Sequence, residues 1–191
     1  MGRSKHLQTR QALLEQATQY VLEHGLQDLS LRPLAQALGT NARMLIYHFG
    51  SREHLVAEVL TLAVSRQQAA MQALATEQRF ASLGELLGAF WERLTAPQSR
   101  AFLRLLFEVD VLGFSGHPVY AGFSKAALEG WVGLIESLLE RILGQGDHRS
   151  LATNIVASFN GLVLDLLATK DEARVNRAFQ AFVKTLALSS R

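Results

Sequence analysis

Apolar residues recur along this chain at spacings of three and four, and no alternation of apolar and polar residues with a period of two persists. That spacing is typical of amphipathic α-helices, and only three prolines interrupt it. Leu13, Ala17 and Val21 lie on one apolar face of a first helix that ends near Gly25. The pattern predicts an all-α protein of about nine helices.

Short helices follow the first one. Ser30 is placed to cap a second helix that ends at Gly39, and Ser51 is placed to cap a long fourth helix. A third helix is expected from about Ala42 to His48. Further along, the periodicity and the Pro and Gly breaks predict helices at about 81–95, 98–113, 118–143, 148–168 and 172–188.

The third predicted helix has about two turns, or roughly 10 Å, and cannot serve bulk burial. Leu45 and Phe49 face inward as an i, i+4 pair, which turns Arg43, Met44 and Tyr47 outward. Two helices joined by a short Gly-containing turn form a helix-turn-helix, whose second helix enters the DNA major groove. An outward arginine can donate two hydrogen bonds to guanine, the most common specific contact.

Residues of about 8–60 resemble the DNA-binding domain of TetR-family transcriptional regulators. The resemblance is carried by "QALLEQATQYVLEHG", "LSLRPLAQALG", "NARMLIYHF" and "SREHL". It implies that Ser30, Arg32 and Arg52 contact phosphates. It also implies that Ala42, Arg43 and Met44 contact bases, and that Tyr47 and His48 form an aromatic/His pair that grips the DNA backbone. Two positions depart from the family pattern, because Pro33 replaces a polar residue and Ile46 stands where an aromatic often contacts phosphate.

The resemblance also implies a division of the chain. Residues 1–52 would form a three-helix helix-turn-helix domain, and residues 53–191 a C-terminal helical domain for ligand binding and dimerisation. The expected effector contacts are Trp91, Phe107, Glu108, Phe114, Tyr120, Phe123 and Trp131. The alternatives are an ordinary aromatic-rich core and an i, i+4 salt bridge of Glu108 with Arg104.

The last two predicted helices carry apolar stripes wider than one core contact requires. By resemblance, two such helices from each of two chains form a four-helix dimer interface. Its expected residues are Ile155, Phe159, Leu162, Leu166, Phe179 and Phe182. The alternative is that both stripes are buried within one chain.

Composition and charge narrow the function classes. The absence of Cys excludes a disulfide, a thiolate nucleophile and a Cys-based zinc site. The net charge is only +2, but Arg3, Lys5 and Arg10 form a basic start without acids, a possible flexible arm for DNA. No signal peptide is expected, and the longest uncharged run, residues 150–164, is too short to span a bilayer.

The leading hypothesis is a cytoplasmic, ligand-responsive repressor. It would act as a homodimer on a near-palindromic operator in double-stranded DNA, with a small apolar or amphipathic effector, no cofactor, no metal and no membrane partner. One alternative is a DNA-binding regulator or activator without a small-molecule inducer. The other is an all-helical enzyme, for which the sequence offers no metal cluster, nucleophile–base pair or phosphate-binding loop.

Overall fold

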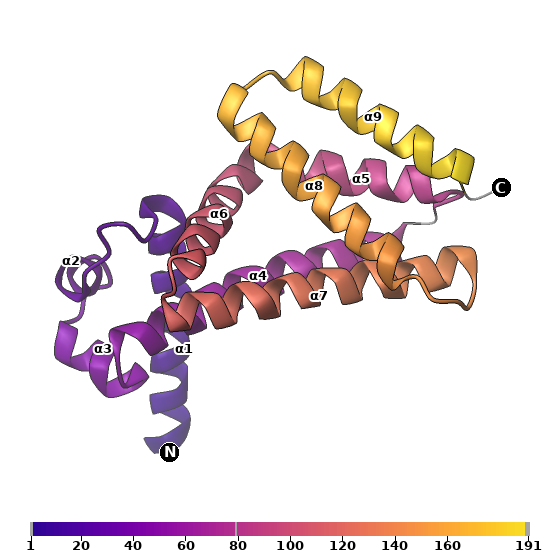
Figure 1. Cartoon of the computed structure of the whole chain (residues 1–191). Coiled ribbons are helices and arrows are strands. Elements are labelled where there is room, and N and C mark those ends of the chain that lie inside the picture. The colour runs from indigo at the N-terminus through magenta and orange to yellow at the C-terminus, as the bar shows by residue number, and fades with distance from the viewer. Residues whose placement is uncertain (1, 79, 190–191) are drawn as a thin grey trace. The chain divides into compact units, whose positions relative to one another are not determined.

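A computed structural model describes residues 2–78 and 80–189 of the chain, and for residues 2–8, 188 and 189 it describes the backbone alone. Within these residues the fold contains nine α-helices, one 3-10 turn and no strand, which confirms the predicted all-α class. In chain order (Figure 1) the elements are α1 (Gly2–His24), α2 (Leu31–Ala37), α3 (Ala42–Phe49), α4 (Arg52–Glu77), α5 (Leu83–Thr95), η1 (Pro97–Ser99), α6 (Arg100–Phe114), α7 (Pro118–Leu143), α8 (Arg149–Thr169) and α9 (Glu172–Ser189).

Local chemistry sets several of these helix ends. Gly25 and Gly50 adopt φ values of +77° and +81°, a conformation that favours glycine, and they end α1 and α3. The Ser51 hydroxyl accepts a hydrogen bond from the backbone N–H of His54 at 3.1 Å, so the predicted cap of α4 is confirmed. Ser30 does precede α2, but its side chain makes no capping hydrogen bond, which corrects that expectation.

The chain packs as two compact units. The first unit contains Met1–Gln67 and Ala101–Ala127, so that α6 and the start of α7 pack with the N-terminal helices. Its core joins apolar side chains of α1 to α4 with Leu105 and Val109 of α6 and Tyr120 of α7. Two helices of about two turns each, α2 and α3, cannot enclose a core alone, and the longer helices supply the missing apolar surface.

The second unit contains Gln68–Arg100 and Leu128–Arg191. In it, α9 packs against both α5 and α8 (Figure 1). Trp91 of α5 stacks on Phe179 of α9 with ring centroids 4.7 Å apart, and Phe159 of α8 meets both rings edge-on. The Trp91 indole N–H donates to Asn176 Oδ1 at 2.7 Å, so the polar atom of this aromatic cluster is satisfied.

These packing units differ from the division into residues 1–52 and 53–191, which is a functional one and stays a prediction. Among the described helices, α8 alone has the length and the apolar composition of a membrane-crossing segment. Of the apolar window in α8, 28% is buried, and the buried residues include Ala152, Ile155 and Val163.

Candidate nucleic-acid interface

The short helix α3 is held by two buried anchors and two caps. Leu45 and Phe49 are buried in the core of the first unit, as the spacing predicts. The side chain of Asn41 accepts a hydrogen bond from the backbone N–H of Met44 at 3.0 Å and caps the N-terminus. Gly50 N–H donates to the carbonyl oxygen of Ile46 at 2.8 Å and closes the C-terminus. The Asn41 cap was missed at the sequence level, although Asn before a helix is a recognised signal.

The outward face of α3 carries the predicted base-contacting side chains. Arg43 and Met44 are exposed, Ala42 is half-buried beside them, and Tyr47 has 67% of its surface exposed. The exposed Ile46 adds an apolar side chain to the same helix. This face therefore presents a guanidinium, a thioether and a phenol on a helix whose opposite side is fixed in the core.

The helix α2 and the turn after it are equally well fixed. Leu34 and Ala35 are buried, and the turn is closed by a hydrogen bond of 2.9 Å from the backbone N–H of Thr40 to the carbonyl oxygen of Ala35. Ser30 and Arg32, the expected phosphate contacts, are exposed at the start of α2. These two side chains thus lie at the helix end that carries the positive end of the helix dipole.

His48 does not share the outward face of α3. It has only 9% of its surface exposed, and its ring packs edge-on against Tyr47 and at a tilt against Phe49. Its backbone carbonyl accepts a hydrogen bond from Arg10 Nε at 3.0 Å. The expected phosphate contact from this imidazole is therefore corrected, because a ring packed into the core supports the helix from inside.

Arg10 likewise has a structural role within the first unit. Its Nη2 donates to both carboxylate oxygens of Glu58 at 2.5 and 2.7 Å, and its guanidinium lies 4.8 Å from the centre of the Phe49 ring. With the bond to His48 it ties α1 to α3 and α4. Arg10 is thus removed from the predicted flexible arm, and the side chains of Arg3 and Lys5 lie outside the described residues.

Arg52 opens α4 beside α2. Its Nε donates to the carbonyl oxygen of Leu29 at 3.0 Å, and its Nη1 lies 3.9 Å from a carboxylate oxygen of Glu53. The pKa of Glu53 is lowered, first by a hydrogen bond from its own backbone N–H and then by Ser51, Arg52 and His117. Arg52 is partly exposed and remains a candidate phosphate contact, already oriented by the Leu29 carbonyl.

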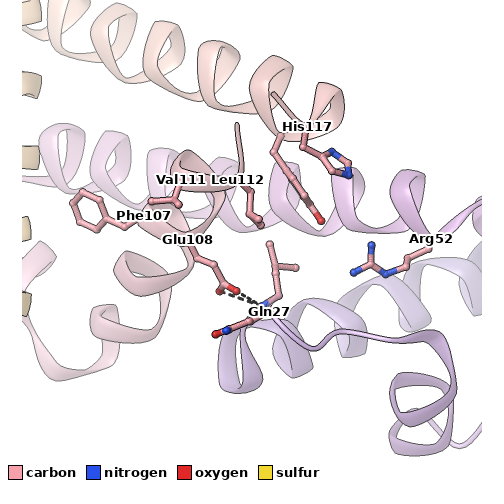
Figure 2. A pocket seen from close by; sticks show the side chains of 9 residues that line it. Gln27, Arg52, Phe107, Glu108, Val111, Leu112 and His117 are labelled. Carbon is pink, nitrogen blue, oxygen red and sulfur yellow. Dashed lines mark hydrogen bonds between the residues drawn. The ribbon is translucent and has the colours of Figure 1, made fainter. Parts of the chain in front are cut away.

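Three of the seven predicted effector residues meet at one cleft. Phe107 and Glu108 of α6 and Tyr120 of α7 line a cleft of about 630 Å³ in the first unit, which Figure 2 shows from close by. Glu108 accepts a hydrogen bond from the backbone N–H of Leu26 at 3.0 Å, so the alternative of a salt bridge with Arg104 is not what the structure contains. The Glu108–Leu26 contact joins residues 82 positions apart, and no sequence pattern pointed to it.

The other four effector candidates lie elsewhere. Phe123 packs half-buried against the core of the first unit, and Phe114 has 80% of its surface exposed. Trp91 and Trp131 belong to the second unit, where Trp91 is part of the aromatic core. Trp91 and Phe123 are therefore core residues, as in the alternative of an ordinary aromatic-rich core.

The predicted dimer residues also divide into two groups. Ile155, Phe159 and Phe179 are buried inside the second unit, so for them the single-chain alternative holds and the interface expectation is corrected. Leu162, Leu166 and Phe182 are half-buried. The exposed side of α8 instead carries small and apolar residues at helical spacing, namely Ala157, Gly161, Leu164 and Ala168.

Among the described residues, no group of three or more His, Asp or Glu side chains could hold a metal ion. The polar side chains of α2, α3 and the start of α4 suit hydrogen bonding to a duplex and offer no paired nucleophile and base.

Residues 13–59 match the family model described as bacterial regulatory proteins of the tetR family. No curated protein sequence matches the chain significantly. Among solved structures, a TetR-family transcriptional regulator from Cytophaga hutchinsonii is 18% identical, covers 96% of this chain and 95% of its own, and superposes with a TM-score of 0.78.

Two further solved structures share the fold and contain ligands. A putative transcriptional regulator from Saccharomonospora viridis in complex with choline is 21% identical, with a TM-score of 0.69 over 93% of this chain and 96% of its own. The multidrug binding protein EbrR complexed with proflavin is 24% identical, with a TM-score of 0.65 over 90% of this chain and 98% of its own. Residues 13–59 are thus similar to the DNA-binding domain of tetR-family bacterial regulatory proteins, and the described helices share the fold of these solved transcriptional regulators.

Proposed function

We propose that this protein is a cytoplasmic transcriptional repressor that binds a near-palindromic operator as a homodimer and releases it in response to a small molecule. The observation that carries the proposal is the two-turn α3, anchored by Leu45 and Phe49, with Arg43, Met44 and Tyr47 exposed on its outer face. Arg43 and Met44 would contact base edges in the major groove, while Tyr47, Ser30, Arg32 and Arg52 would contact phosphates.

Dimerisation follows from the reach of so short a helix. One copy of α3 spans too few base pairs to select a single site, so two copies would occupy successive major grooves about 34–36 Å apart. The outer face of α8 supports a second copy of this chain as the occupant. A Cβ added at Gly161 would meet no atom within 4 Å, and the neighbouring Leu164 has 53% of its surface exposed. This small and apolar face can approach its own copy closely.

Control by a small molecule is supported by the cleft of about 630 Å³ beside the helix-turn-helix. Its volume lies within the range of small-molecule sites. The structural neighbours that contain choline and proflavin are additional support. An effector that binds better to the DNA-free form would shift the population away from the operator-bound form.

The test combines operator selection with a variant at the dimer face. The wild-type chain should enrich duplexes with two inverted half-sites from a random pool, and two chains should bind each duplex. Leu164→Glu should separate the chains in sedimentation equilibrium and weaken operator binding, because it places a charge in the apolar interface. Ser137→Glu, a charge on an exposed position of α7, serves as the control and should leave both properties unchanged. A wild-type chain that is monomeric and still binds one half-site tightly would contradict the dimer.

A further inference from the structure

The cleft of the first unit combines apolar walls with a few polar groups. It is open to solvent and lies beside the α1–α2 turn, the C-terminal half of α6, the first turn of α7 and the start of α4. Its apolar walls come from Leu26, Phe107, Val111, Leu112 and Tyr120, and its polar groups from Gln27, Arg52, Glu108 and His117. Such a lining suits a small organic molecule whose orientation is set by one charge.

Glu108 supplies an acidic group whose charge is not paired with any side chain that the structure describes. Its two oxygens lie 3.0 and 3.1 Å from the backbone nitrogen of Leu26, which can donate one hydrogen. None of the ion pairs recorded among the described side chains involves Glu108, and Arg104 one turn earlier is exposed. A carboxylate has acceptor positions for about four hydrogens, so Glu108 retains capacity for a further donor or a cation.

The basic groups of the cleft lie apart from Glu108. In Figure 2, Arg52 stands well apart from Glu108, Phe107 lies on the far side of Glu108, and His117 lies nearer to Arg52. Arg52 is already bound to the Leu29 carbonyl, and Glu53 lies 3.9 Å from it. The negative charge of Glu53 partly offsets the positive charge of Arg52 at that end. The negative charge of Glu108 has no such counterpart in the part of the chain whose side chains are described.

We propose that this cleft binds a small organic monocation, either a quaternary ammonium or a protonated amine with an apolar or aromatic body. The cationic group would contact the Glu108 carboxylate, and the body would pack on Val111, Leu112 and Tyr120. The Phe107 ring adds a cation–π partner on the residue next to Glu108. Arg52 at the far end limits the site to molecules with a single charge, since a second cationic group would meet a like charge.

The position of Glu108 also connects this site to the helix-turn-helix. Glu108 is the side chain through which α6 holds the turn between α1 and α2. A Cβ at Gly25 would lie 2.9 Å from Glu108 Oε2, so the approach of the carboxylate requires glycine there. A bound cation attracts the Glu108 carboxylate and so weakens the hydrogen bond that this carboxylate accepts from the Leu26 N–H, which loosens the turn that precedes α2. By linkage, DNA and the cation then change each other's affinity. This coupling rests on the proposed function, whereas the site itself does not.

The binding experiment is isothermal titration calorimetry of the full chain with benzyltrimethylammonium, with 3-phenylpropionate as the anionic counterpart. Glu108→Gln keeps an oxygen that can accept from Leu26 N–H but removes the charge, and it should bind the cation at least about tenfold more weakly. Asp110→Asn, two residues along α6 and outside the cleft lining, is the matched control and should bind like the wild type. The wild type should bind the cation in preference to the anion.

A second variant keeps the proposal testable if Glu108→Gln does not fold. Val111 has 61% of its surface exposed, so Val111→Lys should fold normally while placing a cation in the cleft, and it should also lower the affinity for benzyltrimethylammonium at least about tenfold. The proposal is overturned if the wild type does not bind the cation, if the anion binds as well, or if Glu108→Gln and Val111→Lys both bind like the wild type.

Operator titrations with and without benzyltrimethylammonium test whether cation binding changes DNA affinity, separately from whether the cation binds at all. Operator affinity that falls in the presence of the cation for the wild type, and not for Glu108→Gln, supports the coupling. Cation binding with unchanged operator affinity overturns the coupling and leaves the site in place. If selection from a random duplex pool yields no operator, the proposed DNA-binding function is contradicted. The calorimetric test of cation binding does not depend on that result.

Discussion

The helices α3 and α8 both present exposed side chains on a helix with a buried face, yet they do so in different ways. In α3 the buried face consists of Leu45 and Phe49, and Arg43 and Tyr47 are unambiguously outside. In α8 apolar residues surround most of the axis, with Ile155 and Val163 inside and Leu164 outside. A short helix with two anchors has one way to pack, whereas a long helix that is apolar nearly all round has several.

The consequence is that the two helices differ in how a substitution should act. An outward change on α3 should alter DNA binding and leave the fold intact. On α8, an inward change should destabilise the fold, and an outward change should alter assembly. The four substitutions below test this division.

The largest effect is expected for Phe159→Ala on the inward face of α8. The ring packs edge-on against Trp91 and Phe179, at centroid distances of 5.8 and 5.5 Å, and its loss leaves a cavity. The free energy of unfolding should fall by about 3–5 kcal/mol. Urea denaturation measures it, with Asn154→Ala on the exposed side of α8 as a control that stays within about 0.5 kcal/mol. If Phe159→Ala instead converts a dimer to a monomer and leaves the free energy of unfolding unchanged, Phe159 belongs to the dimer interface.

Arg43→Ala should weaken operator binding by about 1–3 kcal/mol and relax the base preference at one position of each half-site. The guanidinium is exposed on the outer face of α3, so the fold should be unaffected. Selection from a random duplex pool measures the preference. Arg93→Ala removes an exposed arginine of α5 and should change neither quantity. Unchanged base preferences in Arg43→Ala would rule out direct readout by this side chain.

Tyr47→Phe should lower affinity by about 1 kcal/mol, equally on the operator and on a scrambled duplex, because a hydroxyl–phosphate bond carries no base identity. Fluorescence anisotropy on both duplexes gives the comparison. Ile46→Val, on the neighbouring exposed residue, removes no hydrogen-bonding group and serves as the control. A loss restricted to the operator would mean that Tyr47 contacts a base.

The smallest effect is expected for Gly161→Ala on the outer face of α8. The added methyl group would meet no other atom of the chain within 4 Å. The free energy of unfolding should therefore rise by up to about 1 kcal/mol, because Ala has a higher helix propensity than Gly. The same methyl group should hinder close approach of a second copy and raise the dimer dissociation constant. The methyl group of Gly133→Ala in α7 would also meet no atom within 4 Å. This control should raise the free energy of unfolding without changing the dimer dissociation constant. Equal dimerisation in both variants would show that Gly161 is outside the interface.

Much of the fold followed from local pattern. Helical periodicity with Pro and Gly breaks predicted each described α-helix, and the start of α7 at Pro118 and its end at Leu143 match the expected range. Short-range chemistry was equally informative for α3, since the i, i+4 pair of Leu45 and Phe49 fixes which side is buried. These features depend on residues within two turns of one another, so the sequence alone determined them.

Tertiary structure decided which of several chemically equivalent partners each side chain meets. Arg10 looked like part of a basic arm, and packing instead directs it to Glu58 and the His48 carbonyl. Glu108 could have paired with Arg104 on its own helix, but it accepts a hydrogen bond from the backbone N–H of Leu26 in the turn after α1. Ion pairs, hydrogen bonds and the choice of buried stripe on α8 join residues distant in the chain. Helical periodicity shows that a face is apolar, but only the packed structure shows what covers it.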